Sequence, residues 1–211
     1  MKKKKVIILA IILVILILAI IAVSKFMTKN KKEETKLLDI YDNLTSSESY
    51  IVTIEQDENN KTIMAKKGEK TVIDQYSRES RSTTLVKDGN TYLVLHDREE
   101  YYVYERNNVE QSILTDGLKE LIDKTCTVGN EKIKGKNYDY EEYEGSTVFM
   151  ISNTSSLNDE GVKTRLYFNK KSELVYVKTI YSEGSELLKV NISNEVDEAL
   201  FEIPSNYAEG N

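Results

Sequence analysis

The stretch Thr83–His96, with the sequence TTLVKDGNTYLVLH, decides the predicted fold. Its two halves are rich in β-branched and apolar residues that alternate with a period of two, which is typical of half-buried strands. Between them lies Lys87-Asp88-Gly89-Asn90. Asp-Gly is a strong signal for a tight turn, because both residue types tolerate the positive φ that such a turn needs. The stretch therefore predicts an antiparallel β-hairpin.

Strand-like segments of the same kind precede and follow this hairpin. They alternate with turn sequences such as Asn59-Asn60 and Ser182-Glu183-Gly184. The expected strands cover residues 50–55, 62–65, 71–76, 83–87, 91–96 and 101–105 in a first series, and residues 132–134, 138–143, 147–152, 162–168, 174–181 and 187–193 in a second. The pattern predicts a long antiparallel meander in two parts.

Two amphipathic helices punctuate the strands, one in residues 33–44 and one in residues 109–122, each with an apolar stripe at helical spacing. Because the twist of many strands accumulates, a sheet of this size is expected to curl, and the helices can then fill its concave face. The predicted fold class is mainly β (α+β), with an N-terminal transmembrane helix followed by a strongly curved antiparallel sheet, a half-barrel, wrapped around two or so amphipathic helices. The side chains expected on its inner face are Val52, Ile54, Val175, Val177, Leu188, Val190 and Ile192.

The N-terminus carries a run of eighteen apolar residues, Val6 to Val23, without charge, Gly or Pro. As a helix the run is about 27 Å long, close to the roughly 30 Å hydrocarbon core of a bilayer. Lys2 to Lys5 before it also resemble the start of a signal peptide, and Ala22-Val23-Ser24 is a passable cleavage site. The apolar region of a signal peptide is typically about 7 to 15 residues. The length thus favours an uncleaved anchor, with a cleaved signal as the alternative.

The predicted organisation follows from this anchor. We expect residues 1–5 to be a cytoplasmic basic tail, 6–27 a transmembrane signal anchor, 28–36 a charged tether, 37–207 one extracytoplasmic domain and 208–211 a frayed tail. A short basic tail ahead of a first apolar segment is the usual start of an exported chain whose N-terminus stays inside. The predicted location is the cell membrane, with a single pass and the bulk of the chain outside.

Charge and cysteine content exclude several functions. Nine lysines and two glutamates give residues 1–36 a net charge of +7, so residues 37–211 carry −13 of the chain's total of −6. Such an acidic domain is repelled by nucleic acid, and we expect no nucleic-acid partner. The single cysteine, Cys126, cannot form an internal disulfide and lies far from any N-terminal lipidation site. An exported domain without disulfides suits a bacterial cell surface.

The order of elements resembles the LolA-like group, the periplasmic outer-membrane lipoprotein carriers and their relatives among bacterial cell-surface proteins. Three short segments carry the resemblance over nearly all of the predicted domain: KGKNY (134–138), LYFNKKSELV (166–175) and LFEIPSNY (200–207). The resemblance implies a half-barrel that holds an acyl chain or another apolar ligand between sheet and helices, and it carries over no catalytic residue. The carriers are soluble shuttles, whereas this chain is predicted to be tethered, so we do not expect it to ferry lipoproteins between membranes.

The residues offer little for catalysis. His96 is the only histidine, Cys126 the only cysteine, and no nucleophile elbow, zinc-protease helix or phosphate-binding glycine loop occurs. We interpret His96 as a surface residue at a strand end and Cys126 as a small core residue. The spacing of Asp139, Glu141, Glu142 and Glu144 matches no Ca²⁺ loop and is more typical of a solvated strand face. We predict no enzyme, no cofactor and no metal.

Fourteen tyrosines, most of them on expected strands, are the remaining candidates. Most should pack across strands, since a strand tyrosine packs its ring and solvates its hydroxyl. Tyr102, Tyr104, Tyr138 and Tyr140 are the predicted lining of a ligand cleft. The predicted function is a membrane-anchored, non-catalytic binding module that holds an apolar ligand or a lipidated partner. The alternative is an envelope-sensing or protein-binding domain without a lipid ligand.

Overall fold

The computed structural model describes residues 35–105, 113–145 and 161–210. The predicted transmembrane anchor at residues 6–27 and the expected strand at residues 147–152 lie outside these described residues. The described chain contains two α-helices, α2 (Lys36–Ser46) and α3 (Ile113–Ile122), and each is followed by a series of strands. The strands and the 3-10 helix η1 are β1 (Ser49–Glu55), β2 (Lys61–Lys67), β3 (Lys70–Tyr76), β4 (Arg81–Lys87), β5 (Asn90–Leu95), β6 (Glu100–Glu105), β7 (Thr127–Ile133), β8 (Lys136–Glu144), β9 (Lys163–Phe168), β10 (Leu174–Tyr181), β11 (Gly184–Ser193), η1 (Glu198–Phe201) and β12 (Ala208–Glu209).

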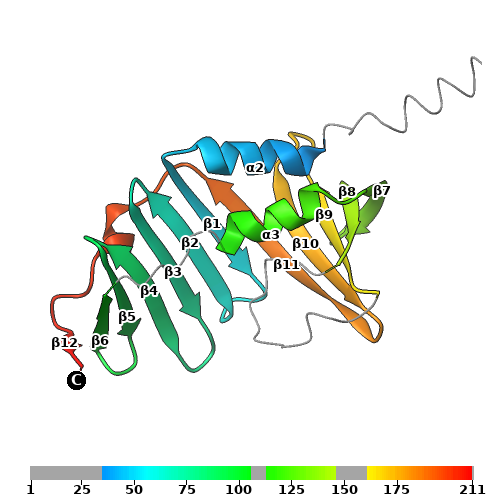
Figure 1. Ribbon diagram of the computed structural model, residues 1–211. Helices are drawn as coiled ribbons and strands as arrows, with labels where there is room; N and C mark the ends of the chain where they lie inside the picture. Colours follow the sequence, from blue (N-terminus) through cyan, green and yellow to red (C-terminus); the bar gives the residue numbers. More distant parts are fainter. Residues whose placement is uncertain (1–34, 106–112, 146–160, 211) are drawn as a thin grey trace, which may run out of the picture. The chain divides into compact units, whose positions relative to one another are not determined.

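The strands form one twelve-stranded sheet in the order β12-β6-β5-β4-β3-β2-β1-β11-β10-β9-β8-β7 (Figure 1). Two meanders meet in its middle, where β1 pairs antiparallel with β11. The predicted hairpin is confirmed as β4 and β5, whose turn places Asp88 at φ 54° and Gly89 at φ 77°. At one edge, β12 pairs in parallel with β6, so residues 208 and 209 of the expected frayed tail form a short strand.

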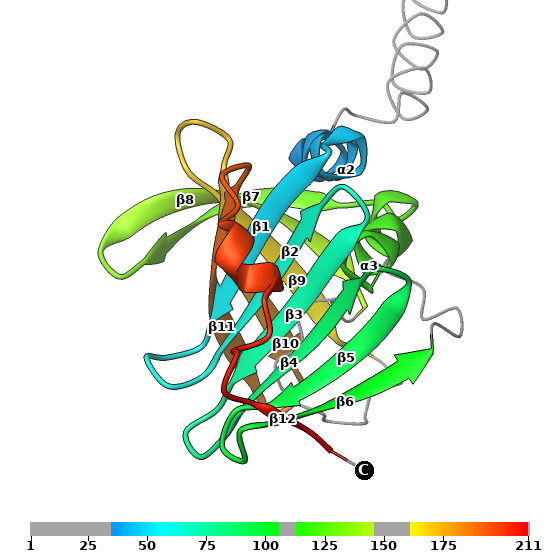
Figure 2. The ribbon, with the colours of Figure 1, turned by 90° about the vertical axis from the view of Figure 1, so that its left-hand side faces the viewer.

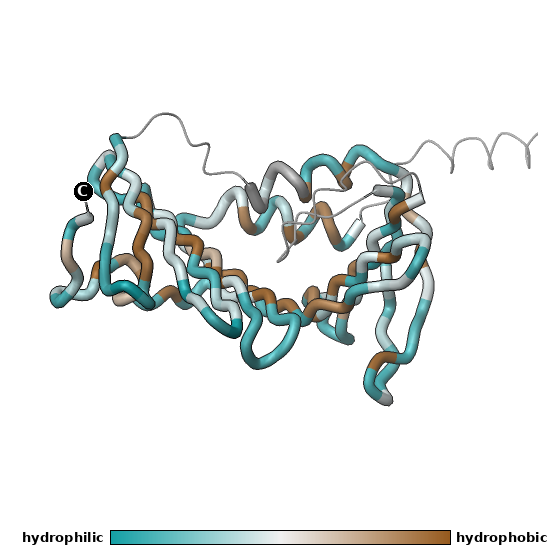
Figure 3. Tube along the Cα trace, turned by 90° about the horizontal axis from the view of Figure 1, so that it is seen from below, coloured by the Kyte–Doolittle hydropathy of each residue, from teal (hydrophilic) through white to brown (hydrophobic). Residues whose placement is uncertain are grey.

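Both helices pack on one face of the sheet, and the larger core lies between the helices and that face (Figure 3). The strict alternation of β1 turns Tyr50, Val52 and Ile54 toward this face. The fully or nearly buried side chains of this core are Leu37, Leu44, Tyr50, Val52, Ile54, Leu118, Leu121, Tyr143, Leu166, Phe168, Leu174, Val177, Leu188 and Val190. Cys126 is half-buried and packs against this cluster, as expected for a small core residue.

A second core lies on the opposite face of the sheet. Ala65, Val72 and Leu85 are cross-strand neighbours on β2, β3 and β4, and Phe201 of η1 packs against them. The segment after β11 thus crosses the outside of the sheet before it reaches β12 (Figure 2). The alternation of Phe201, Glu202 and Ile203 predicts an extended segment over residues 200–203. Instead η1 occupies part of it, because the carboxylate of Asp197 accepts the N–H of Ala199 and caps a 3-10 turn.

The predicted fold class is wrong. Among the described residues, no helix is long and apolar enough to cross a membrane. The sheet is open, because its edge strands β12 and β7 do not pair with each other, and it is not curled into a half-barrel. Strong curling needs bulges or glycine kinks at repeated positions. In the described pairs the one register shift falls between Leu174 and Tyr176.

That register shift also changes which side chains of β10 point inward. Leu174 and Val177 are buried in the core, whereas Val175, expected on the inner face, is only half-buried. A bulge places two residues opposite one and so shifts the alternation by one position. Of the other six side chains expected inside, Ile192 is half-buried and the rest are buried.

Candidate functional site

A half-open groove of about 580 Å³ runs between helix α2 and strands β10 and β11. Its apolar lining combines Ile40 and Leu44 of α2 with Leu174, Val175, Val190 and Ile192 of the strands. Polar side chains from α2, from the turn between β9 and β10 and from the end of β11 form its rim, namely Asp39, Asn43, Lys171, Ser172, Glu173, Asn191 and Asn194. An apolar floor with a polar rim is the arrangement that suits an amphiphilic ligand.

Glu141 of β8 fixes the helical wall of this groove at its N-terminus. Its carboxylate is buried and accepts the backbone N–H of Lys36 at 2.7 Å and that of Leu37 at 3.2 Å. The hydroxyl of Tyr143 donates to the same carboxylate at 2.9 Å. The first N–H groups of a helix lack partners within the helix and carry partial positive charge, so a carboxylate there is favourable. The interpretation of these acidic residues as a solvated face is therefore wrong for Glu141.

The opposite rim of the groove is a turn with its own internal bonds. The side-chain oxygen of Asn169 accepts the N–H of Lys171 at 2.9 Å and the N–H of Glu173 at 3.1 Å. The amide nitrogen of Asn169 donates to the Glu173 carboxylate at 2.7 Å. These bonds hold the turn in one shape. The groove thus lies between two walls that are each fixed by side-chain bonds to the backbone.

The four tyrosines predicted to line a cleft lie far apart in the sheet. Tyr102 and Tyr104 are on β6, Tyr138 and Tyr140 are on β8, and eight strands separate the two pairs. None of the four lines the groove. Tyr138 packs its ring edge-on against Tyr176 at 5.5 Å, which is the cross-strand packing expected of most tyrosines. Contact of either pair with a ligand stays a prediction.

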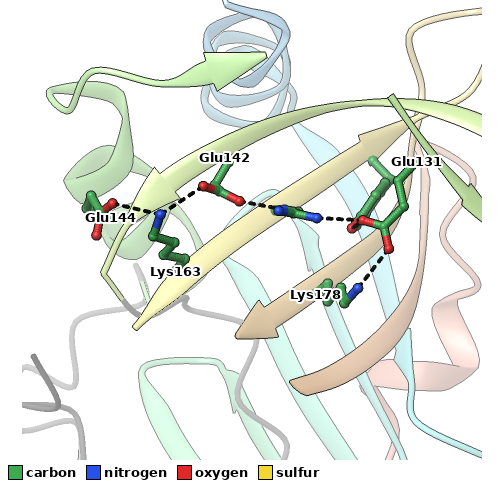
Figure 4. Close-up of polar contacts among 7 residues, drawn as sticks. Glu131, Glu142, Glu144, Lys163 and Lys178 are labelled. Atoms are coloured by element: carbon green, nitrogen blue, oxygen red, sulfur yellow. Dashed lines mark hydrogen bonds and ion pairs between the residues drawn. The ribbon is translucent and has the colours of Figure 1, made fainter. Parts of the chain in front are cut away.

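Tyr140 belongs to a polar network on the outer face of β7 to β10. Glu142 contacts both Arg165 and Lys163, and Lys163 also lies 3.3 Å from Glu144 (Figure 4). The carboxylate of Glu131 accepts from Arg165 at 2.7 Å, from the Tyr167 hydroxyl at 2.6 Å and from Lys178 at 2.8 Å. The guanidinium of Arg165 lies over the ring of Tyr140. The network ties four strands together.

The pKa of Glu131 makes this network sensitive to acid. Partial burial alone would raise that pKa, but hydrogen bonds from Lys178, Tyr167 and Arg165 outweigh it and lower the pKa from 4.5 to about 2. The ionised carboxylate therefore stabilises the fold above about pH 4.5, and this contribution is lost as the pH falls toward 2.

We expect Glu131→Gln to lower the free energy of unfolding at neutral pH, and the difference from the native chain to shrink in urea titrations at falling pH. The control Glu183→Gln, in an exposed turn, should follow the native curve at each pH. A Glu131→Gln difference that does not vary with pH would contradict this.

His96 takes part in a second polar cluster beneath the C-terminal segment, beside a small cavity of about 190 Å³. The Thr83 hydroxyl donates to the buried carboxylate of Asp74 at 2.8 Å and so accepts from Nε2 of His96, also at 2.8 Å. Nδ1 of His96 lies 3.1 Å from the Tyr207 hydroxyl. Burial, and then the charge of Arg81, lower the pKa of His96. His96 is thus a half-buried clamp between sheet and C-terminal segment rather than the surface residue expected.

The groove was not predicted, because its residues share no motif. Nothing in the sequence around Ile40 and Asn43 distinguishes them from the other residues of the helix. They line the groove because the turn after β9, which lies far along the chain, forms its other side. The sequence YEEY (140–143) contained a signal for Glu141. In a strand Glu141 shares one face with Tyr143, so an acid occupies a position on the side where an apolar residue is expected. Its partner, the start of α2, is about a hundred residues away, so the pairing was not visible.

Comparison with known proteins gives matches among solved structures alone. No protein-family model matches the sequence, and no curated protein matches it. Solved structures do match, among them an uncharacterised conserved protein from Thermus thermophilus, with 9% identity and a TM-score of 0.45 over 83% of this chain and 96% of the other. The Mycobacterium tuberculosis lipoprotein LppX matches with 13% identity and a TM-score of 0.46 over 78% of this chain and 98% of the other. At these values the likenesses identify neither a family nor a function.

Proposed function

We propose that this chain is a non-catalytic binding module that holds the apolar part of an amphiphile, such as an acyl chain, in the groove beside α2. The groove carries the proposal. Its volume of about 580 Å³ lies within the range of roughly 300 to 1,000 Å³ that is usual for small-molecule sites. Its floor is aliphatic and its rim polar, so a ligand with a hydrocarbon tail and a polar head satisfies both parts. The sequence resemblance to LolA-like proteins agrees with this ligand class.

Filling the groove from its rim tests the proposal. Asn43 is an exposed residue of α2 that lines the groove, so Asn43→Trp should place a large ring in it without removing a core side chain. We expect this variant to bind a fluorescent fatty acid at least about tenfold more weakly than the native chain, because the ring excludes the tail. The measurement is a fluorescence titration of the full chain.

Asp42→Trp is the matched control. Asp42 is the adjacent exposed residue of the same helix, and it does not line the groove. The two variants have the same new side chain on the same helix, so a general effect of the ring on α2 would appear in both. If both bind the fatty acid as the native chain does, or if the native chain takes up none, the proposed function is wrong.

The second candidate function is envelope sensing or protein binding with no lipid ligand. The specific observation that favours it is the fixed turn at the groove rim, whose side-chain bonds give the rim one shape of its own. Lipid extraction of the purified full chain followed by mass spectrometry separates the two candidates. A co-purifying amphiphile supports the first, and its absence together with no uptake of fatty acid supports the second.

For location we propose the cell membrane, with the bulk of the chain on the extracytoplasmic side. The support is the apolar run Val6 to Val23 with Lys2 to Lys5 before it. We expect the full chain to stay with membranes through carbonate washing and residues from Asp39 onward to be digested by protease added to intact cells. A fragment that begins near Lys25 in the medium would show that the run is a cleaved signal instead.

A further inference from the structure

The end of the β7–β8 hairpin carries three exposed lysines, which we call the basic tip: Lys132 on β7, Lys134 in the turn and Lys136 on β8. No acidic residue occurs from Lys132 to Tyr138, although residues 37–211 carry a net charge of −13. Within the described part of the chain, no carboxylate lies at ion-pair distance from any of the three. Other lysines of the sheet, such as Lys163, Lys178 and Lys189, do have such partners. The basic tip is thus a local exception to the charge of its domain.

The strand register shows that the basic tip projects. β8 pairs with β9 from Asp139 onward, whereas residues 136–138 pair with β7 alone. Three residues at about 3.4 Å each carry the tip roughly 10 Å beyond the third strand. Figure 2 shows the β7–β8 hairpin reaching past the neighbouring strands. The ring contact between Tyr138 and Tyr176 supports the base of this projection.

The length of the projection decides which charges of the domain interact with a surface on which it docks. At physiological ionic strength, charges are screened over about 8 Å. A planar anionic surface in contact with the basic tip therefore interacts with the three lysines and is largely screened from the acidic body behind them. Contact through the acidic body brings its carboxylates within that distance of the surface. The charge distribution thus favours contact through the basic tip.

The mouth of the groove lies at the same end of the sheet as the basic tip. β9 ends at Phe168, which is the partner of both Asp139 on β8 and Leu174 on β10. The turn that follows Phe168 supplies the groove rim and carries two more exposed lysines, Lys170 and Lys171. The acids at this end include Asp39 on the groove rim, Glu173, bonded to Asn169, and Asp139, which lies 3.6 Å from Lys36.

We propose that the basic tip docks on an anionic phospholipid bilayer and turns the mouth of the groove toward the lipid headgroups. This inference rests on the proposed function for its purpose, because a groove for amphiphiles needs access to the bilayer that holds them. A bilayer fits better than an acidic protein, since the described domain follows a lysine-rich segment that is predicted to lie at a membrane. Each lysine near such a surface favours docking about fivefold, so the three together favour it roughly a hundredfold.

Energy transfer to labelled lipid tests the docking. The full chain, with Cys126→Ala, carries one fluorophore on a new cysteine at the tip, Asn137→Cys, and is combined with vesicles that contain a headgroup-labelled acceptor lipid. We expect transfer to be higher in vesicles with phosphatidylserine than in pure phosphatidylcholine. It should fall at 1 M salt, where the screening length is about 3 Å. The same fluorophore on Ser182→Cys, in the turn at the other end of β10, should show a smaller dependence, because it lies farther from the docked surface.

The variant Lys132→Gln/Lys134→Gln/Lys136→Gln separates docking from ligand binding. It should lower the ratio of docked to undocked protein by roughly a hundredfold and return transfer to its value in phosphatidylcholine. In solution without vesicles it should bind fluorescent fatty acid as the native chain does, since none of the three lysines lines the groove. Transfer that is equal in both lipids, or unchanged in this variant, overturns the docking and leaves an acidic protein as partner. If the native chain itself does not bind fatty acid, the proposed function is wrong instead.

Discussion

Phe201→Ala is expected to lower the free energy of unfolding by about 3 to 5 kcal/mol, which is the usual cost of truncating a buried phenylalanine. Phe201 has no exposed surface and packs in the second core against Ala65, Val72 and Leu85. A domain of this size has a total stability of about 5 to 15 kcal/mol, so the loss is a large share of it. Urea denaturation of the full chain followed by circular dichroism measures the effect.

Glu202→Ala is the control for this prediction. Glu202 is adjacent in sequence, but its side chain is 64% exposed and its one described ion pair is with Lys87 at 3.2 Å. Exposed pairs of this kind contribute about 0 to 1 kcal/mol. The two variants alter the same segment, and burial distinguishes them. Overlaid denaturation curves would mean that η1 is not part of the cooperative core.

The burial of Phe201 was predictable from the sequence, whereas its conformation was not. An apolar pair around Glu202, followed by Pro204, indicated that this segment returns to the core, and Phe201 and Ile203 both contact the second cluster. The alternation suggested a strand. The 3-10 turn depends on the Asp197 cap, whose local hydrogen bond competes with an extended backbone.

Short sequence motifs predicted the turns correctly but did not predict the curvature of the sheet. Asp88-Gly89 specifies its own hairpin because the required φ values belong to these two residues. The bend of the sheet belongs to no single residue, since it depends on how many strand pairs contain a bulge. The described sheet has its one register shift at Leu174 and Tyr176, and Val175 between them is half-buried and lines the groove.

The second core was missed for a related reason. One apolar face was expected for each strand, but Ile51, Ala65, Val72 and Leu85 lie opposite the helix-facing side chains of the same strands. A strand buried on both faces shows no clean alternation, and a cover that comes from the far end of the chain leaves no local signal. The same limit applies to the groove, whose two walls are more than a hundred residues apart in the sequence.

Glu141→Ala has the other large expected effect, because it acts on the stability of the domain and on the groove together. The substitution removes the acceptor for two N–H groups of α2 and for the Tyr143 hydroxyl. A buried donor left without a partner costs about 1 to 3 kcal/mol, and the loss of negative charge at a helix N-terminus adds about 0.3 to 2 kcal/mol. We expect a loss of about 3 kcal/mol in the free energy of unfolding.

The location of that loss is what identifies Glu141 as the fixing point of the groove wall. Hydrogen exchange should show the amides of α2 losing protection before those of β1 and β11, because strand pairing does not involve Glu141. Binding of fluorescent fatty acid should weaken with them, since Ile40 and Leu44 of α2 line the groove. Asp139→Ala, on the same strand but with a side chain that is 66% exposed, should change stability by less than about 1 kcal/mol. If Glu141→Ala leaves both the protection of α2 and fatty-acid binding at their native values, the helix is held by its apolar face alone, and the buried carboxylate has no part in shaping the site.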